Sequence, residues 1–114
     1  AIEKFFVQAA PVVGIRPKAT GADRHVYRMG KVPRLLVQRG DALEPRFGRL
    51  GREYSRIGFD KELLKRDPTL EWVTPGHPLF EVVRDAALEQ AQDHLKRGAV
   101  FFDIQMSWLQ PKLG

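Results

Sequence analysis

The 114-residue sequence contains no cysteine and no long run of apolar residues. Without cysteine there is no disulfide framework and no thiolate metal site. No apolar stretch approaches the roughly 20 residues that span a bilayer, and the N-terminal AIEKFFVQAA lacks the apolar core of a signal peptide. With 43% hydrophobic and 29% charged residues, the chain is expected to be a cytoplasmic globular domain with one core.

The motifs of common catalytic and nucleotide sites are also missing. There is no P-loop pattern, and GRLGRE lacks the strand–turn–helix context of a dinucleotide fingerprint. The three histidines, at positions 25, 77 and 94, form no H-x₃-H pair. We therefore expect no catalytic residue, no metal site and no cofactor in this chain.

The two ends predict a segment of a longer protein. The chain opens without methionine inside a helix-like pattern and stops at LQPKLG, just after a strand-like run. We expect one accessory domain over 1–114, with the helix at 1–13 able to continue an upstream segment.

Positive charge is concentrated in the first part of the chain. Residues 1–66 hold 15 Lys or Arg against 7 Asp or Glu, a net of +8, whereas residues 67–114 hold 4 against 7, a net of −3. A basic half favours an anionic partner. Arginines interleaved with Phe47 and Tyr54 could bind phosphates while the aromatic rings stack on bases. The candidate nucleic-acid residues are Arg34, Arg46, Arg49, Arg52 and Arg56.

Two alternatives to nucleic-acid contact stay open for this basic region, which also includes Arg39. One is a solvated surface whose arginines pair with Asp85, Glu89 and Asp93 of the second half. The other is contact with a protein partner. The irregular spacing of the arginines does not separate the three.

Hydrophobic periodicity predicts a short helix over 1–10 and a strand near 24–30. The segment 32–41 fits either a helix opened by Pro33 or a strand. Because of its glycines, the segment 44–58 is predicted to be a loop that enters a strand at 54–59. A turn or single helical turn at 60–67 and a strand at 70–74 follow.

The second half predicts a helix over 78–96 and then a strand over 99–106. Pro78 suits the first helical position, and Gly98 suits the stop. The fold class is therefore α+β (or α/β), with a small mixed sheet, one long packed helix and a short N-terminal helix. The helix positions expected to be buried are Leu79, Phe80, Val83, Ala87, Ala91 and Leu95.

The start of this long helix raises the question of His77. Thr74, His77 and Pro78 are expected to form a structural helix start, in which the imidazole bonds nearby backbone. The alternative, a catalytic base, needs a partner, and the neighbouring sequence offers only Glu71 and Glu81.

The stretch GREYSRIGFDKELLKRDPTLEWVTPGHPLFEVV resembles a region of the bacterial and archaeal Swi/Snf-type (RapA-like) helicases that follows their two ATPase lobes. In that family a strand ending in Phe-Asp, a short charged segment and a threonine-ended strand followed by His-Pro introduce a helix. IGFD at 57–60, LEWVT at 70–74 and GHPLF at 76–80 occupy those places here. The resemblance covers about residues 50–104 and rests on the order of the three pieces.

This resemblance implies a non-catalytic accessory α/β module of a double-stranded-nucleic-acid translocase. ATP and Mg²⁺ are expected in the parent motor, because its ATP-binding and DExH motifs lie upstream. Only His77 and Pro78 map residue for residue, and their role is structural. The implied partners are nucleic acid, the motor lobes, and RNA polymerase or phage-defence proteins, with no membrane. The alternative function is a protein-interaction module docking on the motor lobes or RNA polymerase, with Trp72 or Trp108 as apolar anchors.

Overall fold

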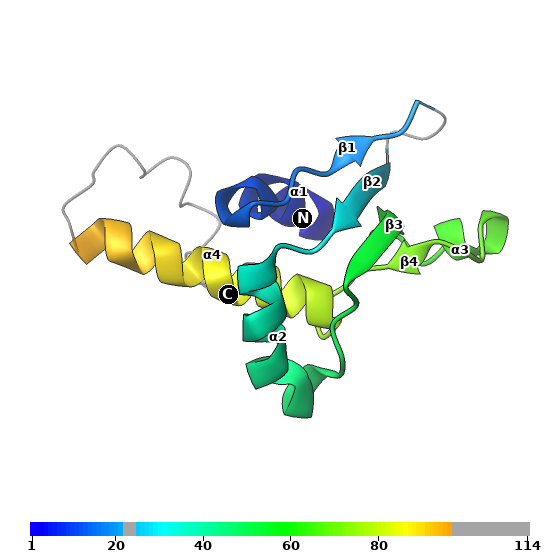
Figure 1. The fold of residues 1–114 in the computed structure, drawn as a ribbon. Coiled ribbons are helices and arrows are strands. Elements are labelled where there is room, and N and C mark those ends of the chain that lie inside the picture. Colours follow the sequence, from blue (N-terminus) through cyan, green and yellow to red (C-terminus); the bar gives the residue numbers. More distant parts are fainter. Residues whose placement is uncertain (22–24, 97–114) are drawn as a thin grey trace, which may run out of the picture.

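The computed structural model describes residues 1–21 and 25–96, in which helices pack on a four-stranded sheet (Figure 1). The helices are α1 (Ile2–Ala9), the 3₁₀ helix η1 (Ala10–Val13), α2 (Arg34–Phe47), α3 (Leu63–Arg66) and α4 (Pro78–Lys96). The strands are β1 (Lys18–Ala19), β2 (Val26–Lys31), β3 (Glu53–Gly58) and β4 (Glu71–Trp72). The strand predicted over 99–106 lies outside the described residues.

The sheet has the strand order β1-β2-β3-β4. The pairs β1–β2 and β2–β3 are antiparallel, whereas β4 runs parallel to β3. This mixed sheet, together with the long helix over 78–96 and the short N-terminal helix, confirms the predicted α+β class.

Helix α4 forms the centre of the core. It packs against α1, η1 and α2, and Phe80 lies 6.4 Å from the ring of Phe6, which in turn lies 5.3 Å from Phe59. Five of the six helix positions predicted to be buried are buried. The pattern missed Val82, Ala86 and Glu81, because α4 is enclosed on more than one side near its start. The buried residues of α4 are Leu79, Phe80, Glu81, Val82, Val83, Ala86, Ala87 and Ala91.

The prediction that Leu95 is buried is wrong. Its side chain is 56% exposed. The apolar period continues to Leu95, but the last buried residue of α4 is Ala91, and Figure 1 shows the helix extending past α1 and α2 at its C-terminal end. Periodicity reports which face of a helix is apolar; it does not report where the neighbouring elements end.

The prediction of a loop beginning at residue 44 is also wrong, since α2 runs to Phe47 and includes Pro45. The missing N–H of Pro45 removes one bond in the last turn, yet Gly48 N–H still bonds Glu44 O at 2.8 Å. Gly40, near the middle of α2, allows close packing, because a Cβ there would lie 2.8 Å from Leu50 Cδ2. The segment left open at 32–41 is therefore mostly helix, with Pro33 as its N-cap.

The two faces of the sheet are covered differently. Side chains alternate along each strand, so Tyr27 and Ile57, which are cross-strand partners, face the core packed around α4. On the opposite, outer face, Leu63 and Leu70 pack against Val26. A Cβ on Gly58 would lie 2.9 Å from Leu70 Cδ2. The absence of a side chain at Gly58 therefore allows Leu70 to pack closely against the outer face of the sheet.

Leu79→Ala should lower the free energy of unfolding by about 2–5 kcal/mol, because Leu79 is fully buried and its truncation leaves a cavity. Leu95→Ala, at an exposed position of the same helix, should change it by less than about 0.5 kcal/mol. Urea unfolding of the two variants checks both values. Equal losses in the two variants would contradict this account of the core.

Candidate nucleic-acid interface

His77 acts as a cap at the start of α4. Its Nδ1 accepts a hydrogen bond from Leu79 N–H at 3.0 Å, and its Nε2 lies 2.7 Å from Glu71 Oε2. Because an amide N–H can only donate, Nδ1 carries no proton and Nε2–H donates to Glu71. The ring nitrogen Nδ1 thus satisfies an N–H that the helix leaves without a partner.

Glu81 adds a second contact at the same helix end. Although only 5% exposed, its carboxylate accepts a hydrogen bond from Gly76 N–H at 2.8 Å and pairs with Arg84 at 2.9 Å. The turn closes with His77 N–H bonded to Thr74 O at 2.9 Å. Thr74, His77 and Pro78 therefore lie where the sequence placed a helix start, and both carboxylates considered as partners for His77 are used in building it.

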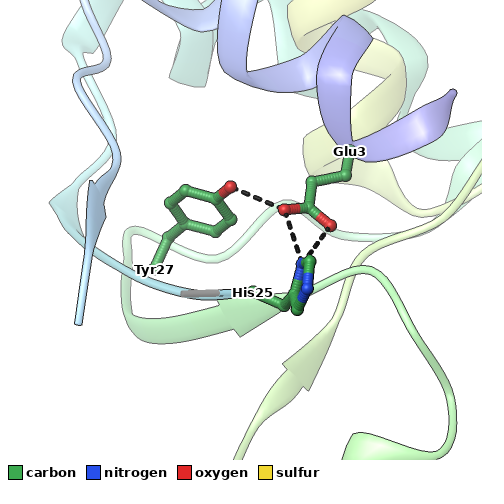
Figure 2. Close-up of polar contacts among 3 residues, drawn as sticks. All are labelled: Glu3, His25 and Tyr27. Carbon is green, nitrogen blue, oxygen red and sulfur yellow. Dashed lines mark hydrogen bonds and ion pairs between the residues drawn. The ribbon is translucent and has the colours of Figure 1, made fainter. Parts of the chain in front are cut away.

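A second histidine contact joins α1 to the start of β2 (Figure 2). Tyr27 O–H donates to Glu3 Oε2 at 2.6 Å, and His25 Nδ1 lies 3.2 Å from both carboxylate oxygens of Glu3. Burial, followed by the hydrogen bond and negative charge of Glu3, raises the pKa of Tyr27 to about 12. At neutral pH the phenol therefore remains a hydrogen-bond donor that ties the N-terminal helix to the sheet.

Tyr27→Phe should remove a phenolate transition centred near pH 12, measured by ultraviolet absorbance during an alkaline titration. The folded-state pKa lies above the ordinary value of 10, so the stabilisation by this group is complete below pH 10 and declines as the pH rises toward 12. Wild type should lose stability over that range more steeply than Tyr27→Phe. A Tyr27 transition near pH 10 would instead show that the Glu3 contact is not formed.

Two of the arginines singled out in the sequence pair with carboxylates. Arg39 contacts Asp85 and Glu89, each at 2.7 Å, as the solvated-surface alternative expects. Arg56 contacts Asp67 at 2.5 Å and donates to Thr69 Oγ1 at 2.8 Å. Hydrogen bonds from Thr69, aided by the charge of Arg56, lower the pKa of Asp67.

The other four candidates, Arg34, Arg46, Arg49 and Arg52, are exposed. Within residues 1–21 and 25–96, none of them makes an ion pair with a carboxylate; Arg46 instead lies 4.9 Å from the centre of the Phe47 ring. They form two groups. Val32 N–H bonds Arg52 O at 2.8 Å, which brings Arg52 near the start of α2, whereas Arg46 lies about 18 Å further along this helix at 1.5 Å per residue.

A third basic feature lies on the outer face of the sheet and was missed in the sequence. Lys18 is directly opposite Arg28, which is directly opposite Arg56. Residues directly opposite each other on neighbouring strands share a face, and all three side chains are exposed. From the sequence, the alternation of Arg28 with Tyr27 and Met29 could have placed Arg28 on a polar face. Its alignment with Lys18 and Arg56, however, depends on the register of the strands. We call Lys18, Arg28 and Arg56 the cation row.

A cavity of about 310 Å³ opens between α1, α2 and α4. Its wall combines apolar and charged side chains: Phe5, Leu43, Arg46, Phe47, Glu81, Arg84, Asp85 and Leu88. Glu81 and Arg84 pair with each other, as do Asp85 and Arg39. Most of the cavity's charge is therefore already neutralised within the protein.

In the part of the chain that the structure describes, no group of three or more His, Asp or Glu side chains could hold a metal ion. No helix there has the length and apolar character needed to cross a membrane. A scan against protein-family models found no match, and searches of curated proteins and of solved structures found none either.

The cation row should cost stability, because like charges directly opposite each other repel. Arg28→Gln should raise the free energy of unfolding by roughly 0.2–1 kcal/mol at low salt. The matched variant is Lys31→Gln on the same strand, whose cross-strand partner is Glu53; it should lower that energy by a similar amount. Both effects should shrink near 1 M salt. Destabilisation by Arg28→Gln at low salt would contradict the repulsion.

Proposed function

We propose that this chain is a non-catalytic, cytoplasmic accessory domain of a Swi/Snf-like ATP-dependent helicase or translocase, and that it contributes nucleic-acid contact to the motor. The observation that carries the proposal is the set of exposed arginines without a described carboxylate partner: Arg34, Arg46, Arg49 and Arg52. The resemblance of residues 50–104 to the region after the ATPase lobes supplies the context of a motor.

The partner expected from these groups is a phosphate backbone. Guanidinium groups match phosphate oxygens in geometry as well as in charge. Two separated basic groups, one at each end of α2, could contact phosphates some distance apart. Such contacts fix the position of a domain on nucleic acid without reading its sequence, which suits an accessory part of a translocating motor.

A protein-interaction module is the second candidate function, with docking on the motor lobes or on a partner such as RNA polymerase. The observation that favours it is apolar surface on α2. Leu35 is 78% exposed, and Leu43 and Phe47 line the cavity beside α4. Of the two tryptophans considered as anchors, Trp72 is partly covered by Lys61, whose Nζ lies 5.8 Å from the ring centre. Trp108 lies outside the described residues.

Fluorescence anisotropy with duplex and single-stranded DNA and RNA, at about 50 and 200 mM salt, tests the nucleic-acid function. Wild-type affinity should fall by orders of magnitude between the two salt concentrations if several phosphates are contacted. Replacing Arg34, Arg46, Arg49 and Arg52 by Gln should weaken binding on the order of tenfold or more. The loss should be similar for different sequences, because phosphate contacts carry no base information.

The matched control replaces four exposed cations elsewhere, Lys4, Arg16, Lys65 and Lys96, by Gln. This control changes the net charge by the same amount. If binding uses a specific surface, the control variant should lose much less affinity than the variant of the four arginines. If wild type binds no nucleic acid even at low salt, the proposal fails and the protein-interaction module becomes the better explanation. Leu35→Ser would then be the variant to compare in binding to the motor lobes.

A further inference from the structure

The cation row differs from the arginines of α2 and its following loop, because the sheet fixes its spacing. Lys18, Arg28 and Arg56 are held in register by three neighbouring strands. Strands lie about 4.8 Å apart, so the row extends over about 10 Å. In duplex DNA each strand carries one phosphate per about 3.4 Å of helix axis, so this length corresponds to roughly three nucleotides of one strand.

Of the three cations in the row, only the one at its end, Arg56, is paired with a carboxylate of the described residues. No described carboxylate pairs with Lys18 or Arg28. By contrast, the last register pair of β2, Lys31 with Glu53, combines opposite charges. Like charges placed directly opposite each other repel, and an anion lying along the row would relieve that repulsion.

At the other end, Asp67 and Thr69 hold Arg56. Asp67 Oδ2 contacts one guanidinium nitrogen, and Thr69 Oγ1 accepts a hydrogen bond from another. Thr69 in turn donates its hydroxyl to Asp67 Oδ1 at 2.6 Å and its N–H to the same oxygen at 3.2 Å. The Arg56 side chain nevertheless keeps 42% of its surface exposed, so a second anion can still approach it.

We propose that the cation row binds the phosphates of one nucleic-acid strand across the outer face of the sheet, and that Asp67 competes with those phosphates for Arg56. This proposal rests on the proposed nucleic-acid function. It specifies the binding surface, which is the cation row, and the group that regulates binding, which is Asp67. Lys18 and Arg28 contact phosphates directly. Arg56 joins them to the extent that a phosphate replaces the Asp67 carboxylate, so the pairing with Asp67 holds affinity below the value that three free cations would give.

The first test measures the salt dependence of Lys18→Gln/Arg28→Gln by the same anisotropy titration. Removing two phosphate contacts should reduce the slope of log affinity against log salt by roughly 1.4 for single strands or 1.8 for duplex. At low salt, affinity should fall on the order of tenfold for each cation. The matched variant Lys4→Gln/Lys96→Gln removes the same charge from α1 and α4 and should leave the slope nearly unchanged.

The second test concerns Asp67→Asn, which keeps the shape of the turn but removes the competing charge. Affinity should rise several-fold, and the slope should steepen by roughly 0.7–0.9 as Arg56 gains a full phosphate contact. Glu62→Gln removes a nearby carboxylate that pairs with Lys65 and not with Arg56, and should change neither quantity by as much. Because these are exposed or partly exposed positions, circular dichroism should show all variants folded.

The outcomes separate this proposal from the general function. If wild type binds with a steep salt slope but the Lys18/Arg28 variant matches it, the row is overturned while nucleic-acid contact stands on the arginines of α2. If the row variant weakens binding but Asp67→Asn behaves like Glu62→Gln, the competition by Asp67 is overturned and the row remains. An absence of wild-type binding overturns both.

Discussion

The fixed start of α4 is the constraint on which the rest of the structure depends. Only five residues separate the end of β4 at Trp72 from Pro78, and within them His77 bonds both Glu71 and Leu79 N–H. One imidazole therefore links the last strand of the sheet to the first turn of the central helix. Because α1, η1 and α2 all pack on α4, the direction in which α4 leaves the sheet determines where the core forms.

Most of the core lies on one side of the sheet, and this decides what the other side can do. Leu63 and Leu70 cover the outer face only near Gly58 and Val26. Two residues before Gly58 on β3, Arg56 is exposed on that face, directly opposite Arg28. A basic surface can thus be carried by the most regular part of the fold, which keeps its charges at a fixed separation that a flexible loop would not provide.

The sequence predicted local features better than features that depend on distant neighbours. Helix α4 has an apolar period and a proline at its first position, and its bounds follow from these signals alone. The exposure of Leu95 and the helical end of α2 at Phe47 do not, since one depends on where α1 and α2 stop and the other on Leu50 packing against Gly40. The cation row was out of reach for a similar reason. Its members are 10 and 28 positions apart in the chain, and only the strand register brings them together.

The pairing of Arg56 with Asp67 shows how such a row can exist in a marginally stable domain. Three free cations in line would oppose sheet formation, and domains of this size have only some 5–15 kcal/mol of stability in total. Asp67 neutralises one end of the row, and Thr69 holds the carboxylate in place. The same pairing that lowers the repulsion in the free domain must weaken when a phosphate takes Arg56. Stability of the free sheet and affinity for an anion are therefore opposed at this one contact, and Asp67 sets the balance between them.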